Sequence, residues 1–164
     1  GFLADVCLAW ETQASVALEL KVRTCLLRFG VILSRAAGAL HAMLPAFEWG
    51  LGGPLGSGKQ FMSWMDLDDV AAGMLFVLEN ENMSGPVNFV SPQAVTNREF
   101  SKTLATVLNR PCLLKVPGFA LKVVMGEKAQ PLLLASANVV PEKLLQAGFR
   151  FQYPQLKDSF KHLL

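Results

Sequence analysis

The sequence predicts an α/β fold in which helices pack on a parallel β-sheet. Residues Lys21–Leu33 form an almost continuous apolar run, which is typical of a strand buried on both faces between helices. The preceding residues, Phe2–Leu20, repeat apolar side chains at helical spacing and predict a helix. After the strand, helical and extended patterns follow one another to the end of the chain.

Local patterns predict the remaining elements. Helices are expected at Ala39–Trp49, Val70–Glu79, 96–109, 118–125, 128–137, 141–147 and 156–164. Short strands are expected at Phe61–Leu67, Pro86–Val90 and Cys112–Val116, with an extended piece at 149–151. Thr96 and Glu99 have the spacing of a capping box. Asp68 or Asp69 should cap the 70–79 helix, because a carboxylate there accepts hydrogen bonds from the free N–H groups of the first turn.

Length and composition are those of one domain with a sizeable core. The chain has 164 residues, 52% of them apolar, and begins with Gly1 rather than methionine, so we expect the C-terminal part of a longer protein. A formal net charge of +2, with scattered basic residues, indicates no surface for nucleic acid. No apolar run reaches the roughly 18–20 residues of a membrane-spanning helix, so we expect no membrane partner.

The cysteines and histidines are too few and too far apart for a disulfide framework or a metal site. Cys7, Cys25 and Cys112 are odd in number and widely spaced, which favours a reducing compartment, and we expect a cytoplasmic protein. His41 and His162 have no partner at metal-ligand spacing. We therefore predict no metal ligands and interpret both histidines as structural or exposed.

The glycine-rich stretch Gly50–Gln60 has part of a phosphate-binding motif. Residues Gly53–Gln60 fit G-x-x-x-x-G-K, with Gln60 in place of the Ser or Thr that would hold magnesium. A phosphate loop also needs a preceding strand and a following helix, because the helix N-terminus supplies part of the anion site. Neither flank fits, so we predict no ATP site. The dinucleotide fingerprint G-x-G-x-x-G is absent as well.

Several segments together are similar to one family of enzymes. They are Leu26–Leu33, Gly52–Gln60, Ser63–Val70, Gly85–Asn88, Thr96–Phe100, Val139–Leu144 and Gly148–Phe151. The combination resembles the C-terminal half of the extended short-chain dehydrogenase/reductase superfamily. In particular it resembles the atypical branch of nucleoside-diphosphate-sugar epimerase-like proteins with their C-terminal domain of unknown function. The resemblance covers essentially the whole chain.

The resemblance implies a fold and a division into two parts. The fold is α/β: the C-terminal part of a Rossmann-type parallel sheet that carries NADP or NAD, plus a small mixed α/β substrate domain. Residues 1–35 and 67–95 correspond to the remnant of the Rossmann domain, and residues 36–66 and 96–164 to the substrate-binding C-terminal extension. The glycine fingerprint belongs to the family's N-terminal half and is missing here, so we expect this chain alone to bind the cofactor weakly.

Two departures from the family pattern bear on catalysis and on the substrate. The superfamily carries Tyr-x-x-x-Lys on the helix before the Arg28 strand. Here Leu3 and Cys7 stand at those positions, and neither can do that proton-transfer chemistry. The chain's only tyrosine is Tyr153, so we assign no catalytic residue. Sugar-nucleotide epimerases usually place an arginine where this chain has Met62, and a methionine cannot neutralise a diphosphate.

The resemblance and the expected strand order together indicate a candidate site. Family members bring the backbone that corresponds to Phe29, Gly30 and Val31 against the nicotinamide ribose. Ligands lie at the carboxyl ends of parallel strands, so the turn after the strand and the returning loop should form one cleft. We expect it to be mainly apolar and to suit a small, weakly charged substrate. The predicted substrate-binding residues are Ser34, Met43, Lys59, Gln60, Met62 and Trp64, with Val31 in the same cleft.

Two functions remain open. The chain is either the substrate-binding half of an NAD(P)-dependent epimerase- or oxidoreductase-like enzyme, or a non-catalytic NAD(P)-binding or protein-interaction module. The intact glycine-rich loop favours the first, and the missing Tyr/Lys pair favours the second. In both cases the Arg28 strand is predicted to be central, and its missing neighbours would leave an apolar edge. We therefore expect self-association, or a separate N-terminal half as partner.

Overall fold

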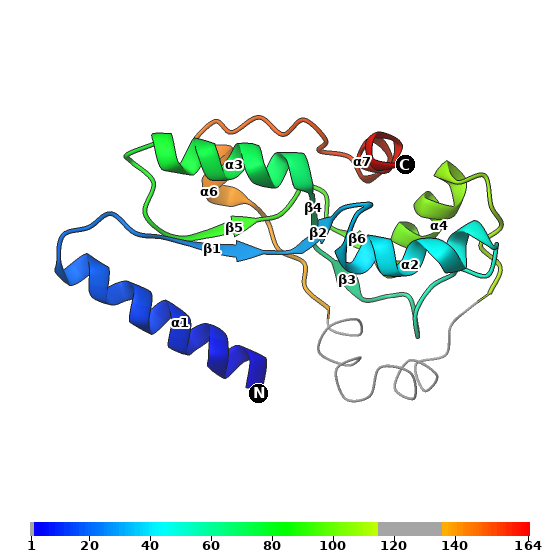
Figure 1. Ribbon diagram of the computed structural model, residues 1–164, viewed down its shortest axis with the longest axis horizontal. Coiled ribbons are helices and arrows are strands. Elements are labelled where there is room, and N and C mark those ends of the chain that lie inside the picture. The colour runs from blue at the N-terminus through cyan, green and yellow to red at the C-terminus, as the bar shows by residue number, and fades with distance from the viewer. Residues whose placement is uncertain (1, 115–135) are drawn as a thin grey trace.

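The computed structural model describes residues 2–114 and 136–164 and confirms an α/β fold with parallel strands (Figure 1). The helices are α1 (Phe2–Glu19), α2 (Gly38–Glu48), α3 (Leu67–Glu79), α4 (Asn97–Val107), α6 (Glu142–Gln146) and α7 (Leu156–Leu163). The strands are β1 (Cys25–Phe29), β2 (Val31–Leu33), β3 (Phe61–Met62), β4 (Trp64–Asp66), β5 (Gly85–Phe89) and β6 (Val95–Thr96). The helices predicted at 118–125 and over most of 128–137 lie outside the described residues.

Within the described residues the strands form three pairs. β1 and β5 are parallel, starting with Cys25 opposite Gly85, and β2 and β4 are also parallel. β3 and β6 form a short antiparallel pair. Because β1 and β2 are separated only by Gly30, the strand predicted at Lys21–Leu33 is confirmed from Cys25 onward. It changes its partner halfway along, however, which the apolar pattern did not indicate.

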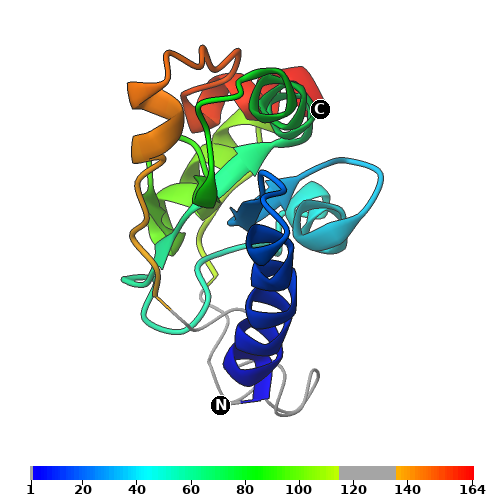
Figure 2. The same ribbon diagram turned by 90° about the vertical axis from the view of Figure 1, so that its left-hand side faces the viewer.

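The β1–β5 pair has α1 on one side and α3 with α6 on the other (Figure 1). Figure 2 shows α1 extending away from the rest of the molecule. Arg28 links β1 to α1, because its guanidinium donates to both carboxylate oxygens of Glu11 at 2.7 Å. The hydrogen bond is the main reason why the pKa of Glu11 is lowered and that of Arg28 is raised. The ion pair is two-pronged and lies at the surface, because Arg28 is exposed.

The predicted burial of β1 on both faces is wrong for this chain. Its residues are half-buried or exposed, and Phe29 is 45% exposed. Apolar side chains of α1 are exposed as well, namely Leu8, Trp10, Val16 and Leu18, as is Leu20 just after the helix. Within the described residues β1 pairs on one edge only. The β1 edge and α1 together therefore form an uncovered apolar surface.

The larger core lies between α2, α4, α7 and the β2–β4 pair. α2 buries Leu40, Leu44 and Phe47, and it confirms the helix predicted at Ala39–Trp49. Phe100 of α4 and Phe160 of α7 pack edge to face, with ring centroids 5.0 Å apart. These contacts hold the C-terminal helix against the first half of the chain, so a long stretch of sequence is closed into one core.

The smaller core lies between the β1–β5 pair, α3 and α6. Val87 and Phe89 of β5 are fully buried there, together with Leu144 of α6. α6 therefore packs on the strands assigned to the Rossmann remnant, although the sequence division groups it with residues 96–164. Pro141 and Ala147 flank this helix as predicted.

The helix N-termini confirm one predicted cap and correct another. Thr96 and Glu99 form the capping box at α4, with the Glu99 N–H donating to the threonine hydroxyl oxygen. At α3, however, the cap is Asp66, whose carboxylate accepts the N–H of Asp68 at 3.0 Å. The sequence placed the cap at Asp68 or Asp69, because it did not show that β4 continues directly into the helix.

Smaller differences concern extended segments. β6 was not predicted, and residues 112–114 are not a strand in the described part of the predicted Cys112–Val116 element. Residues 149–151 are irregular. The rings of Phe149 and Phe151 pack on each other, with centroids 4.8 Å apart. No described helix is both long enough and apolar enough to cross a bilayer.

Candidate functional site

The carboxyl end of the β1–β5 pair meets the start of the β2–β4 pair at Gly30. The Gly30 N–H donates to the Phe89 carbonyl at 3.1 Å, and the Val31 N–H donates to the Ser63 carbonyl at 2.8 Å. The chain thus leaves β5 and joins β4 within two residues. Open α/β sheets hold ligands outside the carboxyl ends of parallel strands. The predicted cofactor residues Phe29, Gly30 and Val31 lie at that end.

Gly30 has no room for a side chain. A Cβ there would lie 2.5 Å from the Ser63 carbonyl oxygen and 2.8 Å from Cγ1 of Val90. The glycine is therefore required by close packing inside the chain. Next to it, Phe29 packs edge to face on Phe89, with centroids 5.3 Å apart, and keeps part of its ring exposed. An exposed ring at a strand end can contact a flat ligand group.

Four residues predicted to line the cleft come together in the larger core. Trp64 has no exposed surface, and Val31, Met43 and Met62 pack against the same cluster while remaining partly buried. Side chains of α2, α4 and α7 occupy the space around the indole. Trp64 therefore supports the site from beneath and does not line an open cleft in this conformation. Its indole N–H has no hydrogen-bond partner among the described residues.

The other predicted substrate residues differ in exposure. Ser34 is half-buried, and its hydroxyl oxygen accepts the Ala36 N–H in the turn after β2. Val31 lies opposite Trp64 in the strand register, and Ser34 comes three residues later, just after β2, or roughly 10 Å further on. Gln60 is buried and donates to a loop carbonyl at 3.0 Å, whereas Lys59 is exposed.

The glycine-rich loop Gly50–Gln60 directs its backbone groups toward α4. The Asn97 N–H donates to the Gln60 carbonyl at 2.9 Å, and the Arg98 N–H donates to the Gly58 carbonyl at 3.0 Å. The Asn97 side chain, which is fully buried, accepts the Leu55 N–H at 2.7 Å. The first N–H groups of α4 are therefore engaged by the loop itself, and they are not offered to an anion.

The glycines of this loop allow it to close on other parts of the chain. A Cβ at Gly52 would overlap the Phe47 ring of α2, and one at Gly53 would overlap the Leu114 carbonyl. Gly58 has a φ of +68°, a conformation that favours glycine. Packing within the protein thus explains the glycine content without a bound phosphate.

We expect the loop not to bind MgATP. The motif lysine, Lys59, is exposed, and the adjoining helix N-terminus is occupied by loop carbonyls. Calorimetric titration with MgATP should release no heat, for the native chain and for Lys59→Ala alike. Saturable binding that disappears in Lys59→Ala would show that this interpretation is wrong.

The segment 136–140, which we call the strap, borders the site, and the sequence analysis predicted no site residue in it. At its start, the Phe61 N–H donates to the Ser136 hydroxyl at 3.0 Å, and the Ala137 N–H donates to the Phe61 carbonyl at 3.1 Å. At its end, the Asn88 side chain donates to the Val140 carbonyl at 3.2 Å. The strap thus connects β3 to β5. The sequence predicted the end of the 128–137 helix at this point, but residues 136 and 137 are irregular, so that end of the prediction is wrong.

Ser63 is the residue of the site that sequence reasoning missed. Its hydroxyl donates to the Ala137 carbonyl at 2.8 Å and accepts the Val139 N–H at 2.9 Å. Its carbonyl is the one that receives the Val31 N–H. The only signal in the sequence was its position next to Trp64 in a segment that is similar to the family.

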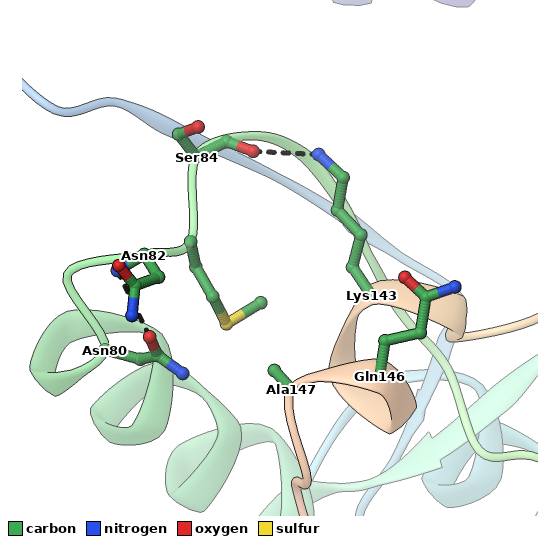
Figure 3. Close-up of a pocket in the computed structure, with 7 residues that line it drawn as sticks. Asn80, Asn82, Ser84, Lys143, Gln146 and Ala147 are labelled. Carbon is green, nitrogen blue, oxygen red and sulfur yellow. Dashed lines mark hydrogen bonds between the residues drawn. The ribbon is translucent and has the colours of Figure 1, made fainter.

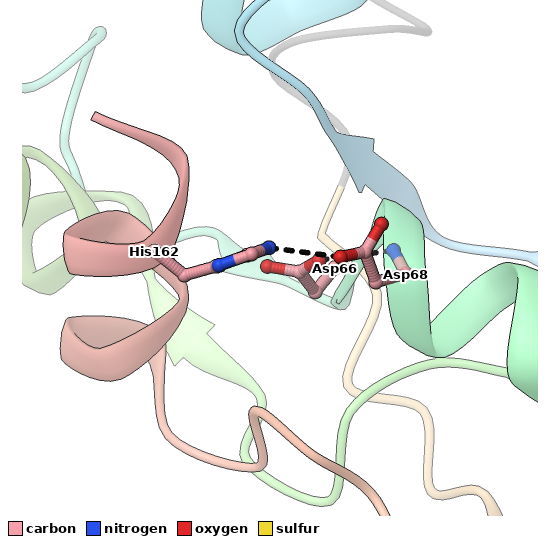
Figure 4. Close-up of side chains that lie close together, drawn as sticks. All are labelled: Asp66, Asp68 and His162. Carbon is pink, nitrogen blue, oxygen red and sulfur yellow. Dashed lines mark hydrogen bonds and ion pairs between the residues drawn. The ribbon is translucent and has the colours of Figure 1, made fainter.

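Two aspartates and a histidine lie close together where α3 meets α7 (Figure 4). Within the described residues, one ligand atom from each of Asp66, Asp68 and His162 lies within 4.8 Å of the others. The buried Asp66 carboxylate accepts the Ser159 hydroxyl at 2.6 Å, and Asp68 pairs with His162 at 2.9 Å. Protein donors thus occupy these carboxylates, and we interpret the cluster as a joint between the two helices. The prediction of no metal site stays a prediction.

Tyr153, the chain's only tyrosine, belongs to the same joint. Its ring stacks on that of His162, with centroids 4.2 Å apart and an interplanar angle of 13°. Burial chiefly, and then the nearby carboxylates, raise the pKa of Tyr153. A raised pKa makes the phenol a poorer proton donor, which fits a packing role better than acid catalysis.

A shallow pocket of about 480 Å³ lies at the opposite end of the β1–β5 pair (Figure 3). It is lined by Asn80, Asn82, Met83, Ser84, Lys143, Gln146 and Ala147. The Lys143 ammonium donates to the Ser84 carbonyl at 2.8 Å. The pocket lies beside Gly85, where β5 begins, whereas ligands of parallel sheets lie at the carboxyl ends. We therefore place the candidate site at Gly30.

The chain is similar to known proteins over nearly all of its length. Residues 116–163 match the Domain of unknown function (DUF1731). An epimerase family protein of Mycobacterium bovis is 42% identical over 97% of this chain and 53% of the relative. The chloroplastic epimerase family protein SDR39U1 homolog of Arabidopsis thaliana is 39% identical over 99% of this chain and 46% of the relative. The chain thus spans about half the length of the curated relatives it matches.

Solved structures agree with this relationship. Human epimerase family protein SDR39U1, crystallised with NADPH, is 34% identical with a TM-score of 0.83, over 87% of this chain and 48% of the other. The nucleoside-diphosphate sugar epimerase from Corynebacterium glutamicum is 28% identical with a TM-score of 0.76, over 100% of this chain and 31% of the other. UDP-glucose 4-epimerase of Thermus thermophilus, in complex with NAD, shares the fold at 18% identity, with a TM-score of 0.70 over 94% of this chain and 50% of the other. These likenesses confirm the Rossmann-type fold, and in sequence and structure the chain is similar to about half the length of proteins named as epimerase family proteins.

Proposed function

We propose that this chain is the substrate-binding half of an NAD(P)-dependent epimerase- or oxidoreductase-like protein, and that it contacts the nicotinamide end of the cofactor. One observation carries the proposal: the parallel β1–β5 pair ends at an exposed ring, Phe29, followed by a backbone without a Cβ at Gly30. Strand ends of this kind are where such folds place their ligands. The human relative crystallised with NADPH supports the same assignment.

The residue roles follow from exposure. Phe29, Gly30 and Val31 contact the cofactor in this proposal. Ser34, Lys59, Met43 and Met62, which retain exposed surface, contribute the substrate side, while Gln60 and Trp64 support it from below. Since Met62 cannot neutralise a diphosphate, we propose a small, weakly charged substrate rather than a sugar nucleotide. We also propose a cytoplasmic location, in keeping with the three free cysteines, although one plant relative is chloroplastic.

A second candidate is a non-catalytic protein that binds NAD(P) or a protein partner. The observation that favours it is the placement of Tyr153, which stacks on His162 at the joint of α3 and α7 and whose pKa is raised. Leu3 and Cys7 stand where the family's catalytic pair would be. A chain of this kind would bind the cofactor and turn over no substrate.

Cofactor binding can be tested by restoring the missing half. We expect the 164 residues alone to bind NADPH weakly, with a dissociation constant above roughly 100 μM, because the phosphate-binding fingerprint is absent. Joined to the N-terminal half of the Mycobacterium bovis relative, the chain should bind in the low micromolar range. Calorimetry measures both, and circular dichroism checks folding. A folded joined chain that binds neither NADPH nor NADH would contradict the proposal, and binding without turnover would favour the second candidate.

The uncovered apolar surface of β1 and α1 leads us to propose self-association when the other half is absent. Trp10 is 70% exposed there. We expect light scattering to show dimers or larger species at high concentration, and Trp10→Glu to shift them toward monomer. Trp49→Glu is the matched control, because Trp49 is 81% exposed but lies at the end of α2. A native chain that stays monomeric, or equal effects of both variants, would contradict this expectation.

A further inference from the structure

Ser63 is bonded on two sides at once. Its carbonyl oxygen accepts the Val31 N–H at 2.8 Å, and a Cβ on Gly30 would meet this same oxygen at 2.5 Å. On the other side, its hydroxyl bonds to both Ala137 and Val139 of the strap. The residue is only 5% exposed, so little water can replace these bonds if they break.

The strap depends on these bonds for its position. It has no helix or strand of its own, and its described backbone contacts are with Phe61, Ser63 and Asn88. Of these three, Ser63 alone also bonds to Val31, the residue that follows Gly30. A displacement of the strap is therefore transmitted to the strand end through one buried side chain, and the reverse holds as well.

We infer that Ser63 is a positioning residue that couples the docking of the strap to ligand binding at the Gly30 turn. The inference rests on the proposed function, since it takes the ligand to lie at Phe29–Val31. Coupling of this kind is reciprocal, so a ligand that stabilises the turn also stabilises the strap by the same factor. The strap falls within the matched domain of unknown function, residues 116–163. Ligand binding at Phe29–Val31 would thus change how firmly this domain is held at the strap.

Hydrogen exchange of the 164-residue chain tests the coupling without any ligand. In Ser63→Ala the Ser63 carbonyl remains, but we expect the N–H groups of Val31, Ala137 and Val139 to exchange about tenfold faster, as for the loss of roughly one net hydrogen bond. Ser91→Ala is the matched control. Ser91 is buried as well, with 1% exposed, and its hydroxyl donates to the Pro154 carbonyl at 2.8 Å, outside the strap. It should leave the Val31 exchange unchanged.

A second variant changes the strap instead of Ser63. Ala137→Pro removes the N–H that donates to Phe61 and leaves β4 untouched, so it should also accelerate exchange at Val31. It keeps the test decisive if Ser63→Ala does not fold. If the strap N–H groups exchange faster in either folded variant while Val31 exchanges as in the native chain, Ser63 only anchors the strap and the inference is overturned.

The joined chain separates this inference from the proposed function. With NADPH, the native joined chain should show slower exchange at Ala137 and Val139, and Ser63→Ala should weaken NADPH binding about tenfold while Ser91→Ala does not. NADPH affinity that is unchanged in Ser63→Ala would overturn the coupling. If the native joined chain binds no NADPH, the proposed function fails, and exchange at Val31 still decides whether strap and turn are coupled.

Discussion

Replacing Gly30 with alanine is expected to destabilise the folded chain by about 3 kcal/mol, at the upper end for overpacked interiors. The added Cβ would meet the Ser63 carbonyl oxygen at 2.5 Å and Cγ1 of Val90 at 2.8 Å. The Ser63 oxygen cannot move away without losing the Val31 N–H. Urea unfolding followed by tryptophan fluorescence measures the change. Trp64 reports it, because it is fully buried whereas Trp10 and Trp49 are exposed.

Gly148→Ala separates the steric effect from backbone strain. Gly148 has a φ of +84°, and a Cβ there would meet nothing within 4 Å, so only the conformational cost of about 1 kcal/mol is expected. If Gly30→Ala costs no more than Gly148→Ala, the close approach at Gly30 does not exist. The description of a strand that changes partner at this residue would then be wrong.

The second large effect is expected for Asp69→Ala, at about 3 kcal/mol, because two N–H groups would lose a buried acceptor. Asp69 in α3 is 1% exposed, and its two carboxylate oxygens accept the N–H of Gln152 at 2.7 Å and of Tyr153 at 3.0 Å. This carboxylate therefore holds the C-terminal chain on α3 and guides it toward α7. Urea unfolding measures the loss. Asp68→Ala is the control and should cost less than about 1 kcal/mol, since Asp68 is exposed and pairs with His162 only at the surface.

The pH dependence of Asp69→Asn gives an independent check. Burial raises the pKa of Asp69 above its ordinary value of 3.8. The hydrogen bonds from the N–H groups of Gln152 and Tyr153 lower the pKa, but the effect of burial is larger. A carboxyl group with a raised folded-state pKa holds its proton more tightly in the folded chain. Its contribution to stability is therefore greatest at low pH and falls as pH rises from about 4 through the raised value. Native stability should decline relative to Asp69→Asn over that window. A native chain that gains stability there would contradict the raised pKa.

Local signals were enough to predict most helices and the apolar strand. The local pattern at Ala39–Trp49 predicted α2, and the Thr96 and Glu99 spacing predicted the start of α4. These signals succeed because helix periodicity and capping involve residues that are near in sequence. The start of α3 was misplaced for the opposite reason, because the cap Asp66 also belongs to β4 and its carboxylate bonds to the distant Ser159.

The candidate site shows the same limit. The sequence analysis expected Val31, Met43, Met62 and Trp64 to line an open cleft, whereas these four residues share the larger core. Whether grouped apolar side chains form a cleft or a core depends on what packs over them. Here α4 and α7 do so, from segments far away in the sequence.

The sequence by itself therefore determined the α/β class, most helix positions, the apolar strand and the family resemblance. Each of these depends on composition, on short-range periodicity or on local motifs. Tertiary structure alone decided that the strand changes partner at Gly30, that the glycine-rich loop closes on α4, and that Ser63 joins the strap to the strand end. These features depend on contacts between segments up to 76 residues apart, such as Val139 with Ser63, and no local pattern encodes which distant group will meet a given carbonyl or hydroxyl.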